Sequence, residues 1–225
     1  CQEFETRFSQ YIEVKHAIAV SSCTAALHLS LHVSGIAPGD EVITTPYTFT
    51  ATSEAISYTG ATPVMVDIDP RTLNLDPSQV ESAITAYTKA IVPVHIGGII
   101  SPEMEEISSW CKENNLWLIE DAAHAHGSEF NGKRAGRFGL AAAYSFFATK
   151  VITAAEGGMI VCDDDGLAEA CRGLRDYGKR SQWETVHTYL SSNYRMNEVT
   201  AVIGHYQARK LDSFLQDRDK VADEY

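Results

Sequence analysis

Short apolar runs alternate with longer segments of helical periodicity along most of the chain. Apolar side chains recur at positions 4, 8, 11 and 12, which is the spacing of a helix with one buried side. The apolar run before Ser21 predicts a strand, and the segment after it predicts a helix that buries Leu27 and Leu31 and stops at Gly35. These residues form the first strand and helix of a repeating pattern.

The same alternation continues to about residue 175. Further strands are expected at 41–45, 63–67 and 116–120, and one more is expected to end near His95. The runs "LAAAYSFFA" and "EGGMIVCDD" predict the last two strands. Helices are expected at about 50–58, on either side of the strand that ends near His95, and at 166–175. Alternating strands and helices predict an α/β protein with a mostly parallel sheet covered on both faces. Ligands of such sheets bind beyond the carboxyl ends of the strands.

The last fifty residues depart from this alternation. Segment 176–195 is long, polar and aromatic, which indicates an excursion from the core that serves a function or a partner. The stretch from Thr200 to Tyr225 is a long amphipathic helical pattern that reaches the end of the chain without a stop signal. We find no repeat, low-complexity stretch or internal linker.

Composition narrows the classes of function. A length of 225 residues with 44% hydrophobic residues suits one large domain or two small ones, and a net charge of -12 argues against a nucleic-acid surface. Five cysteines without a C-x-x-C pair suggest neither a metal site nor a disulfide framework. No apolar run is long enough for a membrane span. We therefore expect a soluble cytoplasmic protein without a membrane or nucleic-acid partner, whose N-terminus before Cys1 is cut or missing.

Polar side chains follow several of the predicted strands. Ser21, Ser22, Cys23 and Thr24 stand at a helix N-terminus, where free amides and the helix dipole favour an anion. The same residues would also serve as an ordinary helix cap. No Walker or G-x-G-x-x-G motif occurs, so a nucleoside triphosphate or Rossmann dinucleotide site lacks its usual support.

Asp121 follows the apolar strand "LWLI", next to Glu120. A carboxylate at the end of a central strand is costly to bury unless a cation meets it. The alternative is that Asp121 caps the segment that begins at residue 122. His124, three residues later, would either cap or fill space.

The stretch "YSFFATKVITAAEGG" places Lys150 between small residues and the pair Gly157-Gly158, which would let the chain turn into the next strand. A lysine here is either an exposed loop residue or an amine buried in a dry pocket, where a lowered pKa frees it to attack a carbonyl. Ser145 would add a phosphate donor, and Phe49 would offer a stacking face or pack in the core.

These parts fit one ligand. A phosphate at the Ser/Thr turn, a cationic ring facing Asp121, an aromatic face at Phe49 and an aldehyde reaching Lys150 describe pyridoxal 5'-phosphate (PLP). In this reading Asp121 keeps the ring nitrogen protonated. Lys150 binds the aldehyde and, once displaced by an amino donor, becomes the base that moves a proton.

An ordered set of motifs makes a family resemblance specific. The chain carries, in this order, "VSSCTAALHL", "GDEVITTPYTFTAT", "GATPVMVDID", "AIVPVHI", "LIEDAAHAHGS", "SFFATK", "EGGMIV" and "NYRMNEVTAVIGHYQ". In this it resembles the DegT-type family of PLP-dependent nucleotide-sugar aminotransferases, in the aspartate aminotransferase superfamily. The resemblance implies a three-layer α/β/α large domain with a mixed, mainly parallel sheet, a small C-terminal domain, a homodimer with shared active sites, and a place in deoxyaminosugar and polysaccharide biosynthesis.

The resemblance also implies a role for each matching position. Lys150 corresponds to the Schiff-base lysine, Asp121 to the partner of the pyridine nitrogen, and Phe49 to the aromatic that stacks on the ring. His124 corresponds to the Gln/His position beside the phenolic oxygen. The remaining matches concern the phosphate: Ser145 with the backbone at Cys23 and Thr24, and Asn193, which would reach the neighbouring subunit's cofactor. Cys23 departs from the family pattern, because this turn usually has a glycine.

The resemblance implies that residues 1–209 form the PLP-binding large domain and that 210–225 begin the helix to a C-terminal domain absent from this chain. The leading hypothesis is an aminotransferase with an amino acid, expected to be L-glutamate, as donor and a keto group on a nucleotide-linked deoxysugar as acceptor. A PLP-dependent sugar dehydratase of the same fold is an alternative, although its histidine in place of the lysine disagrees with Lys150. A non-catalytic regulatory or binding domain is the third reading.

Overall fold

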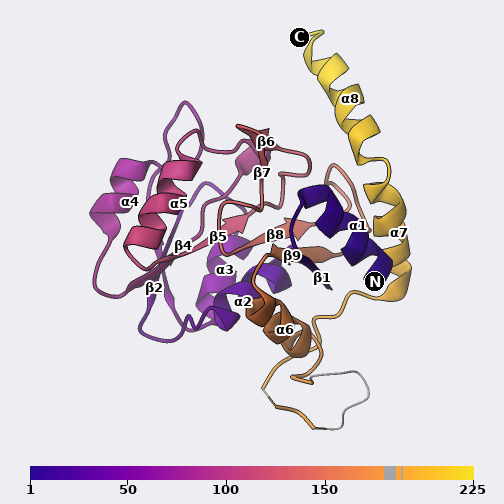
Figure 1. Cartoon of the computed structure of the whole chain (residues 1–225). Coiled ribbons are helices and arrows are strands. Elements are labelled where there is room, and N and C mark those ends of the chain that lie inside the picture. Colours follow the sequence, from indigo (N-terminus) through magenta and orange to yellow (C-terminus); the bar gives the residue numbers. More distant parts are fainter. Residues whose placement is uncertain (180–185, 189) are drawn as a thin grey trace.

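The computed structural model describes residues 1–179, 186–188 and 190–225, and its centre is one seven-stranded sheet (Figure 1). The strands stand in the order β1-β9-β8-β5-β4-β2-β3. Their bounds are β1 His16–Val20, β2 Glu41–Thr44, β3 Thr62–Met65, β4 Thr88–Ile91, β5 Trp117–Asp121, β8 Ala141–Ser145 and β9 Gly158–Cys162. All pairs from β8 to β3 are parallel, whereas β9 runs antiparallel to both β1 and β8. The predicted α/β class with a mixed, mainly parallel sheet is therefore confirmed.

Helices cover both faces of the sheet (Figure 1). Their bounds are α1 Gln2–Ile12, α2 Cys23–Val33, α3 Ala51–Tyr58, α4 Pro77–Ala83, α5 Met104–Glu113, α6 Asp165–Leu174, α7 Glu198–Ala208 and α8 Leu211–Ala222. Helices α2, α3 and α6 pack on one face, and α1, α4, α5 and α7 pack on the other. Two cores result, one in each gap between the sheet and its helices.

Strands β1 and β8 each supply both cores because successive side chains point to opposite faces. Strand β1 sends Ala17 and Ala19 to the core under α1, and Ile18 and Val20 to the core under α2. Strand β8 does the same, and its only large side chain, Tyr144, lies on the α1 side. This explains why the strands read as continuous apolar runs rather than as alternating ones.

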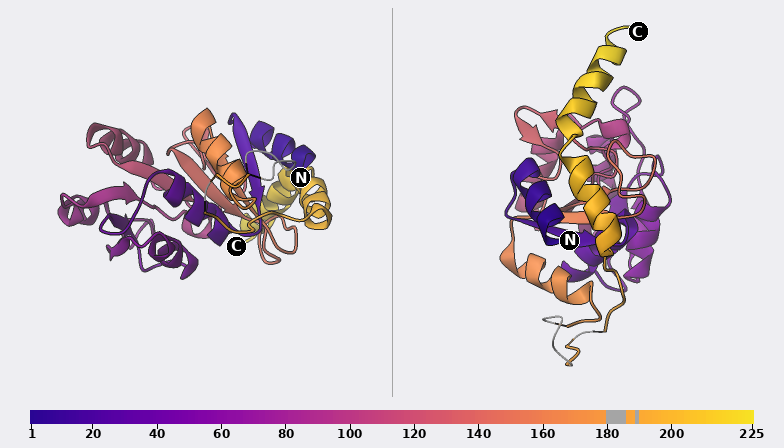
Figure 2. Two further views of the ribbon diagram at one scale, coloured as in Figure 1. Left: turned by 90° about the horizontal axis from the view of Figure 1, so that it is seen from below. Right: turned by 90° about the vertical axis from the view of Figure 1, so that its right-hand side faces the viewer.

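Two parts of the fold differ from the expectation. The helical pattern at the end of the chain is two helices rather than one, because the α-helix stops at Ala208 and a new one starts at Leu211. Helix α8 extends away from the body of the molecule (Figure 2). A two-stranded hairpin, β6 Glu129–Phe130 with β7 Lys133–Arg134, was not expected at all. Of the predicted excursion at 176–195, residues 180–185 and 189 lie outside the described part of the chain.

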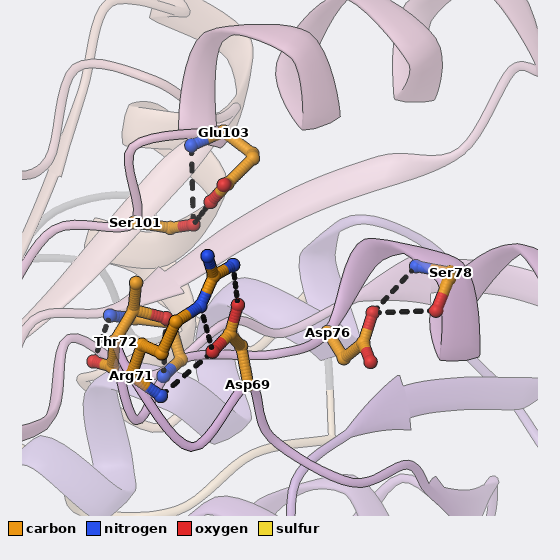
Figure 3. Close-up of polar contacts among 8 residues, drawn as sticks. Asp69, Arg71, Thr72, Asp76, Ser78, Ser101 and Glu103 are labelled. Atoms are coloured by element: carbon orange, nitrogen blue, oxygen red, sulfur yellow. Dashed lines mark hydrogen bonds and ion pairs between the residues drawn. The ribbon is translucent and has the colours of Figure 1, made fainter.

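Polar side chains organise the connection between β3 and α4 (Figure 3). Asp69 receives hydrogen bonds from the backbone amide of Arg71 at 2.7 Å and from its guanidinium at 2.6 Å. These contacts lower the pKa of Asp69 to about 2, because the hydrogen bonds stabilise the carboxylate. Asp76 then accepts a hydrogen bond from the amide of Ser78 at 2.9 Å and caps α4, which has Pro77 in its first turn.

Replacing Asp76 with alanine should lower the free energy of unfolding by about 1 kcal/mol, because α4 loses its N-terminal cap. Urea unfolding of both proteins measures the difference. Asp76→Asn is the matched control, since it keeps a capping oxygen and should stay close to the parent protein. Equal losses in the two variants would show that the cap is not the cause.

Candidate active site

A cavity of about 390 Å³ lies at the carboxyl edge of the sheet. Strands β1, β2, β4, β5 and β8 all end at this edge, and antiparallel β9 begins there. The lining includes Ser22, Cys23, Thr24, Thr48, Phe49, His95, Asp121, His124, Ser145, Lys150, Glu156 and Gly157. The volume is in the range of small-ligand sites. Seven of the eight predicted site residues therefore meet at one cavity, although they come from four separate parts of the chain.

The N-terminus of α2 forms one wall of the cavity. Ser22 caps the helix by accepting a hydrogen bond from the amide of Ala25 at 3.1 Å. The amides of Cys23 and Thr24 stand in the first turn, where an α-helix offers no acceptor for them. Their N–H groups and the helix dipole make this wall a site for an anion. The cap stated above as the alternative is made by Ser22, and it leaves the first-turn amides of Cys23 and Thr24 available to an anion.

Gly158 lets β9 approach this wall closely. A Cβ atom at position 158 would lie 2.3 Å from the carbonyl oxygen of Ser22 and 2.6 Å from the amide nitrogen of Cys23. Both contacts involve backbone, which has little room to move. Gly158 is therefore required by packing, and the turn into β9 that was predicted at Gly157-Gly158 is instead made at Ala155, which has φ 68°. Gly157 and Gly158 are both described, and neither has a positive φ.

Replacing Gly158 with alanine should cost about 1–3 kcal/mol of folding stability, because the added methyl group overlaps the backbone of Ser22. It should also weaken anion binding at the start of α2. Chemical denaturation and phosphate titration measure the two effects. Gly166→Ala is the matched control, since its Cβ meets only the side chain of Asp164 at 3.3 Å. A fully stable Gly158→Ala protein would contradict the close approach.

Asp121 is buried at the floor of the cavity, with 5% of its surface exposed. Its Oδ2 accepts a hydrogen bond from the hydroxyl of Thr52 at 2.7 Å, and its Oδ1 accepts one from the amide of Ala123 at 3.1 Å. Burial raises the pKa of Asp121, whereas the two hydrogen bonds lower it. No lysine or arginine in the described part of the chain pairs with this carboxylate. The cavity thus holds a carboxylate whose charge a cationic ligand would stabilise.

His124 has its ring held by the neighbouring loop. The amide of Gly97 donates a hydrogen bond to Nδ1 of His124 at 3.2 Å. Burial and the nearby charge of Lys150 lower the pKa of His124, which favours the neutral ring. Because Nδ1 accepts, the proton of the neutral ring resides on Nε2. Gly97 has φ 60°, a conformation that favours glycine. His124 can therefore donate a hydrogen bond from Nε2.

Lys150, Ser145 and Phe49 complete the cavity from two sides. Lys150 is half-buried rather than fully buried, and among the described residues it is the only lysine that lines the cavity. Ser145 is buried at the end of β8. Phe49 is 78% exposed, so its ring lies at the cavity with one face free instead of packing in the core. An amine, a hydroxyl and an open aromatic face are thus available to one ligand.

Asn193 is the predicted site residue that does not reach this cavity. It is exposed and forms a backbone bridge with Asp176, away from the residues that line the cavity. A role for Asn193 at the cavity of its own chain therefore finds no support. Its predicted contact with a neighbouring subunit's cofactor stays a prediction.

Three supporting residues did not emerge from the sequence. Thr52 binds Asp121, and the fully buried Glu120 binds His95 at 2.9 Å through Nε2. Glu120 also accepts from backbone amides in the turn before β8. These bonds tie the segment after β4 and the turn before β8 to the end of β5. Thr52 stands among small and polar residues at the start of a helix and gave no signal, whereas the acidic pair at the end of β5 was a visible signal for Glu120.

Comparison with known proteins gives a consistent result. The model of the DegT/DnrJ/EryC1/StrS aminotransferase family matches residues 1–225. GDP-perosamine synthase of Caulobacter vibrioides is 46% identical over 99% of this chain and 60% of its own length. Spore coat polysaccharide biosynthesis protein SpsC of Bacillus subtilis is 43% identical over 100% of this chain and 60% of its own.

A solved structure agrees with these relatives. NtdA from Bacillus subtilis with bound cofactor PMP superposes with a TM-score of 0.87 at 32% identity, covering 93% of this chain and 48% of that one. The chain spans about 60% of the length of the curated relatives it matches. No helix in the described part of the chain is both long and apolar enough to cross a membrane.

Proposed function

Because this chain belongs to the DegT/DnrJ/EryC1/StrS aminotransferase family, we propose that its protein is a PLP-dependent aminotransferase. The donor is an amino acid, L-glutamate by expectation, and the acceptor is a keto group on a nucleotide-linked deoxysugar. One observation carries the proposal: a half-buried lysine and a buried carboxylate, which pairs with no lysine or arginine in the described part of the chain, line the same cavity. The relative named GDP-perosamine synthase supports a nucleotide sugar as the acceptor's class.

The donor set of the cavity fits PLP. The first-turn amides of α2, with the hydroxyls of Thr24 and Ser145, suit a phosphate group. Asp121 suits a protonated ring nitrogen, because its buried carboxylate lacks a cation. Phe49 offers a free ring face, and Nε2 of His124 offers a proton to an oxygen on the ring. The residues present therefore match every polar group of PLP.

Bound PLP would supply a carbonyl group that reacts with amines and a ring that withdraws electrons from the substrate carbon. Lys150 would attach to the aldehyde carbon through Nζ and, when an amino donor displaces it, would act as a general base. Its Nζ would take a proton from the donor carbon and return it to the cofactor carbon. Asp121 would hold the ring nitrogen in its protonated form throughout.

We further propose that the protein is a homodimer with shared active sites. Helix α7 exposes four apolar side chains at positions i, i+3, i+4 and i+7, namely Val199, Val202, Ile203 and Tyr206. Such a face on one helix is typical of a protein interface. Asn193 shortly precedes α7 and is exposed, which supports its reaching the neighbouring subunit's cofactor. Analytical ultracentrifugation of the full-length protein tests the dimer.

The remaining parts of the proposal concern the whole protein. A large domain over 1–209 and a connecting helix from 210 agree with relatives that are longer than this chain. The proposed product is a deoxyaminosugar, and the name of the relative SpsC supports a place in polysaccharide biosynthesis. All five cysteines are free thiols, which supports a cytoplasmic location, where cysteines stay reduced.

The test is amine transfer by the full-length protein. With PLP and L-glutamate, a panel of keto-sugar nucleotides should yield one amino sugar nucleotide, seen by mass spectrometry, together with 2-oxoglutarate. Omitting the amino donor is the control for contaminating product. Elimination of water from the sugar without amine transfer would favour the dehydratase reading, and PLP binding without any turnover would favour a regulatory domain.

A further inference from the structure

Two threonine hydroxyls form a short hydrogen-bond relay that ends on Asp121. Thr48, in the loop after β2, lies 2.9 Å from the hydroxyl of Thr52, and Thr52 lies 2.7 Å from Oδ2 of Asp121. Thr52 stands in the first turn of α3 and is 1% exposed. The hydroxyl of Thr52 also lies 3.3 Å from the carbonyl oxygen of Phe49, a longer contact. These groups connect the loop that carries Phe49 to the carboxylate.

The direction of these hydrogen bonds follows from the number of protons. A threonine hydroxyl donates one proton and accepts through its lone pairs, whereas an ionised carboxylate only accepts. The proton of Thr52 therefore goes to Asp121, where the distance is shorter than to Phe49. The hydroxyl of Thr48 is then the donor to Thr52. All donors of this hydrogen-bond relay therefore point the same way, from Thr48 through Thr52 to Asp121.

The carboxylate is thus held at both oxygens. Oδ2 binds the hydroxyl of Thr52 and Oδ1 binds the amide of Ala123, so rotation of the carboxylate would break two buried bonds. Both bonds favour the ionised form of Asp121, against the burial that disfavours it. A valine at position 52 would keep the shape of the threonine and remove one of the two donors.

We propose that Thr52, oriented by Thr48, is a positioning residue that keeps Asp121 ionised and aimed at a cationic N–H group in the cavity. This inference deepens the proposed function and rests on it for the identity of the cation, which is the protonated ring nitrogen of PLP. Thr52 lies outside the cavity lining and acts through Asp121. Thr48 lines the cavity, so its hydroxyl also couples the relay to the loop that carries Phe49.

Other charged groups around Asp121 are the same in every variant of the test. His95 and His124 are near enough that a proton on either ring would lower the pKa of Asp121, and the thiol of Cys23 interacts with it electrostatically. Lys150 lines the same cavity. Because these groups stay in place, a change in the pKa of Asp121 between variants reports on the hydroxyl at position 52.

The first readout needs no cofactor. The carboxyl carbon of Asp121, labelled with 13C and assigned with Asp121→Asn, is titrated by NMR in the apoprotein. In Thr52→Val the pKa of Asp121 should exceed the wild-type value by about 1 to 2, which is the loss of one hydrogen bond to a charged group. Thr52→Ser keeps the hydroxyl and should restore the wild-type pKa. Thr48→Val should give a smaller increase.

The second readout is the dissociation constant of PLP in the full-length protein. Thr52→Val should bind PLP about ten- to a hundredfold more weakly than the wild type, and Thr52→Ser should bind it nearly as well. An unchanged Asp121 pKa in Thr52→Val would overturn the inference, as would an equal increase in Thr52→Ser, which would indicate a packing effect. Failure of the wild type to bind PLP would instead overturn the proposed function, while the apoprotein titration still decides the relay.

Discussion

Replacing Lys150 with alanine should abolish amine transfer by the full-length protein, lowering kcat/KM by about four orders of magnitude or more. The size of the effect follows from two roles on one nitrogen atom. Nζ of Lys150 would first bind the cofactor and then carry the proton between two carbon atoms. In the part of the chain that the structure describes, no second lysine lines the cavity to take over either role.

Lys133→Ala is the matched control, because Lys133 lies over the ring of Phe138 in a part of the fold away from the cavity lining. It should retain wild-type activity. PLP should still enter the cavity of Lys150→Ala, since the phosphate and ring contacts remain, but without a covalent bond. A Lys150→Ala protein that transfers the amine as fast as the wild type under identical conditions would remove Lys150 from the mechanism.

Replacing Asp121 with asparagine separates activity from stability. Asparagine has the same shape but carries no charge. Its Oδ1 can still accept from the amide of Ala123, and its NH2 group can donate to the hydroxyl of Thr52 in place of the bond that Thr52 donates to Asp121. Activity should fall by about two to three orders of magnitude, because the ring nitrogen loses its buried carboxylate partner. The folded apoprotein should be as stable as the wild type or more stable at neutral pH, since burial raises the pKa of Asp121 and its charge costs folding energy.

The sign of this stability effect can be checked against pH. A carboxyl group with a raised folded pKa favours the folded state most below its unfolded pKa and loses that contribution as pH rises through the folded pKa. The stability difference between Asp121→Asn and the wild type should therefore grow with rising pH in that range. Urea unfolding at several pH values measures it. A variant that is inactive only because it unfolds would contradict the separation.

The layers of the fold could be predicted because hydrophobic periodicity is local. Strands such as β1, β8 and β9 are compact, largely apolar runs, and helices such as α2 start at visible caps. The direction of β9 is not local information, since β9 pairs with β1 from the other end of the chain as well as with β8, which precedes it. The hairpin of β6 and β7 has strands of two residues, too short for a periodic signal, although Asn131-Gly132 is a favoured hairpin turn.

The cavity residues could be predicted because strand ends share an edge. Asp121 and Ser145 are the last residues of two neighbouring parallel strands, so their proximity follows from topology alone. Thr52 could not be found this way, because a threonine inside a helix gives no sign of its partner. The role of Gly158 was also hidden, since a close approach between β9 and α2 depends on tertiary packing.

The most direct measurement locates the covalent bond between PLP and the chain. The full-length protein is saturated with PLP, reduced with borohydride, digested and analysed by peptide mass spectrometry. The account predicts one pyridoxyl adduct, on Lys150 alone, which forms in the wild type and in Thr52→Ser and is absent from Lys150→Ala. An adduct on another lysine, or reduction without any adduct, would contradict the assignment of this cavity as the PLP site.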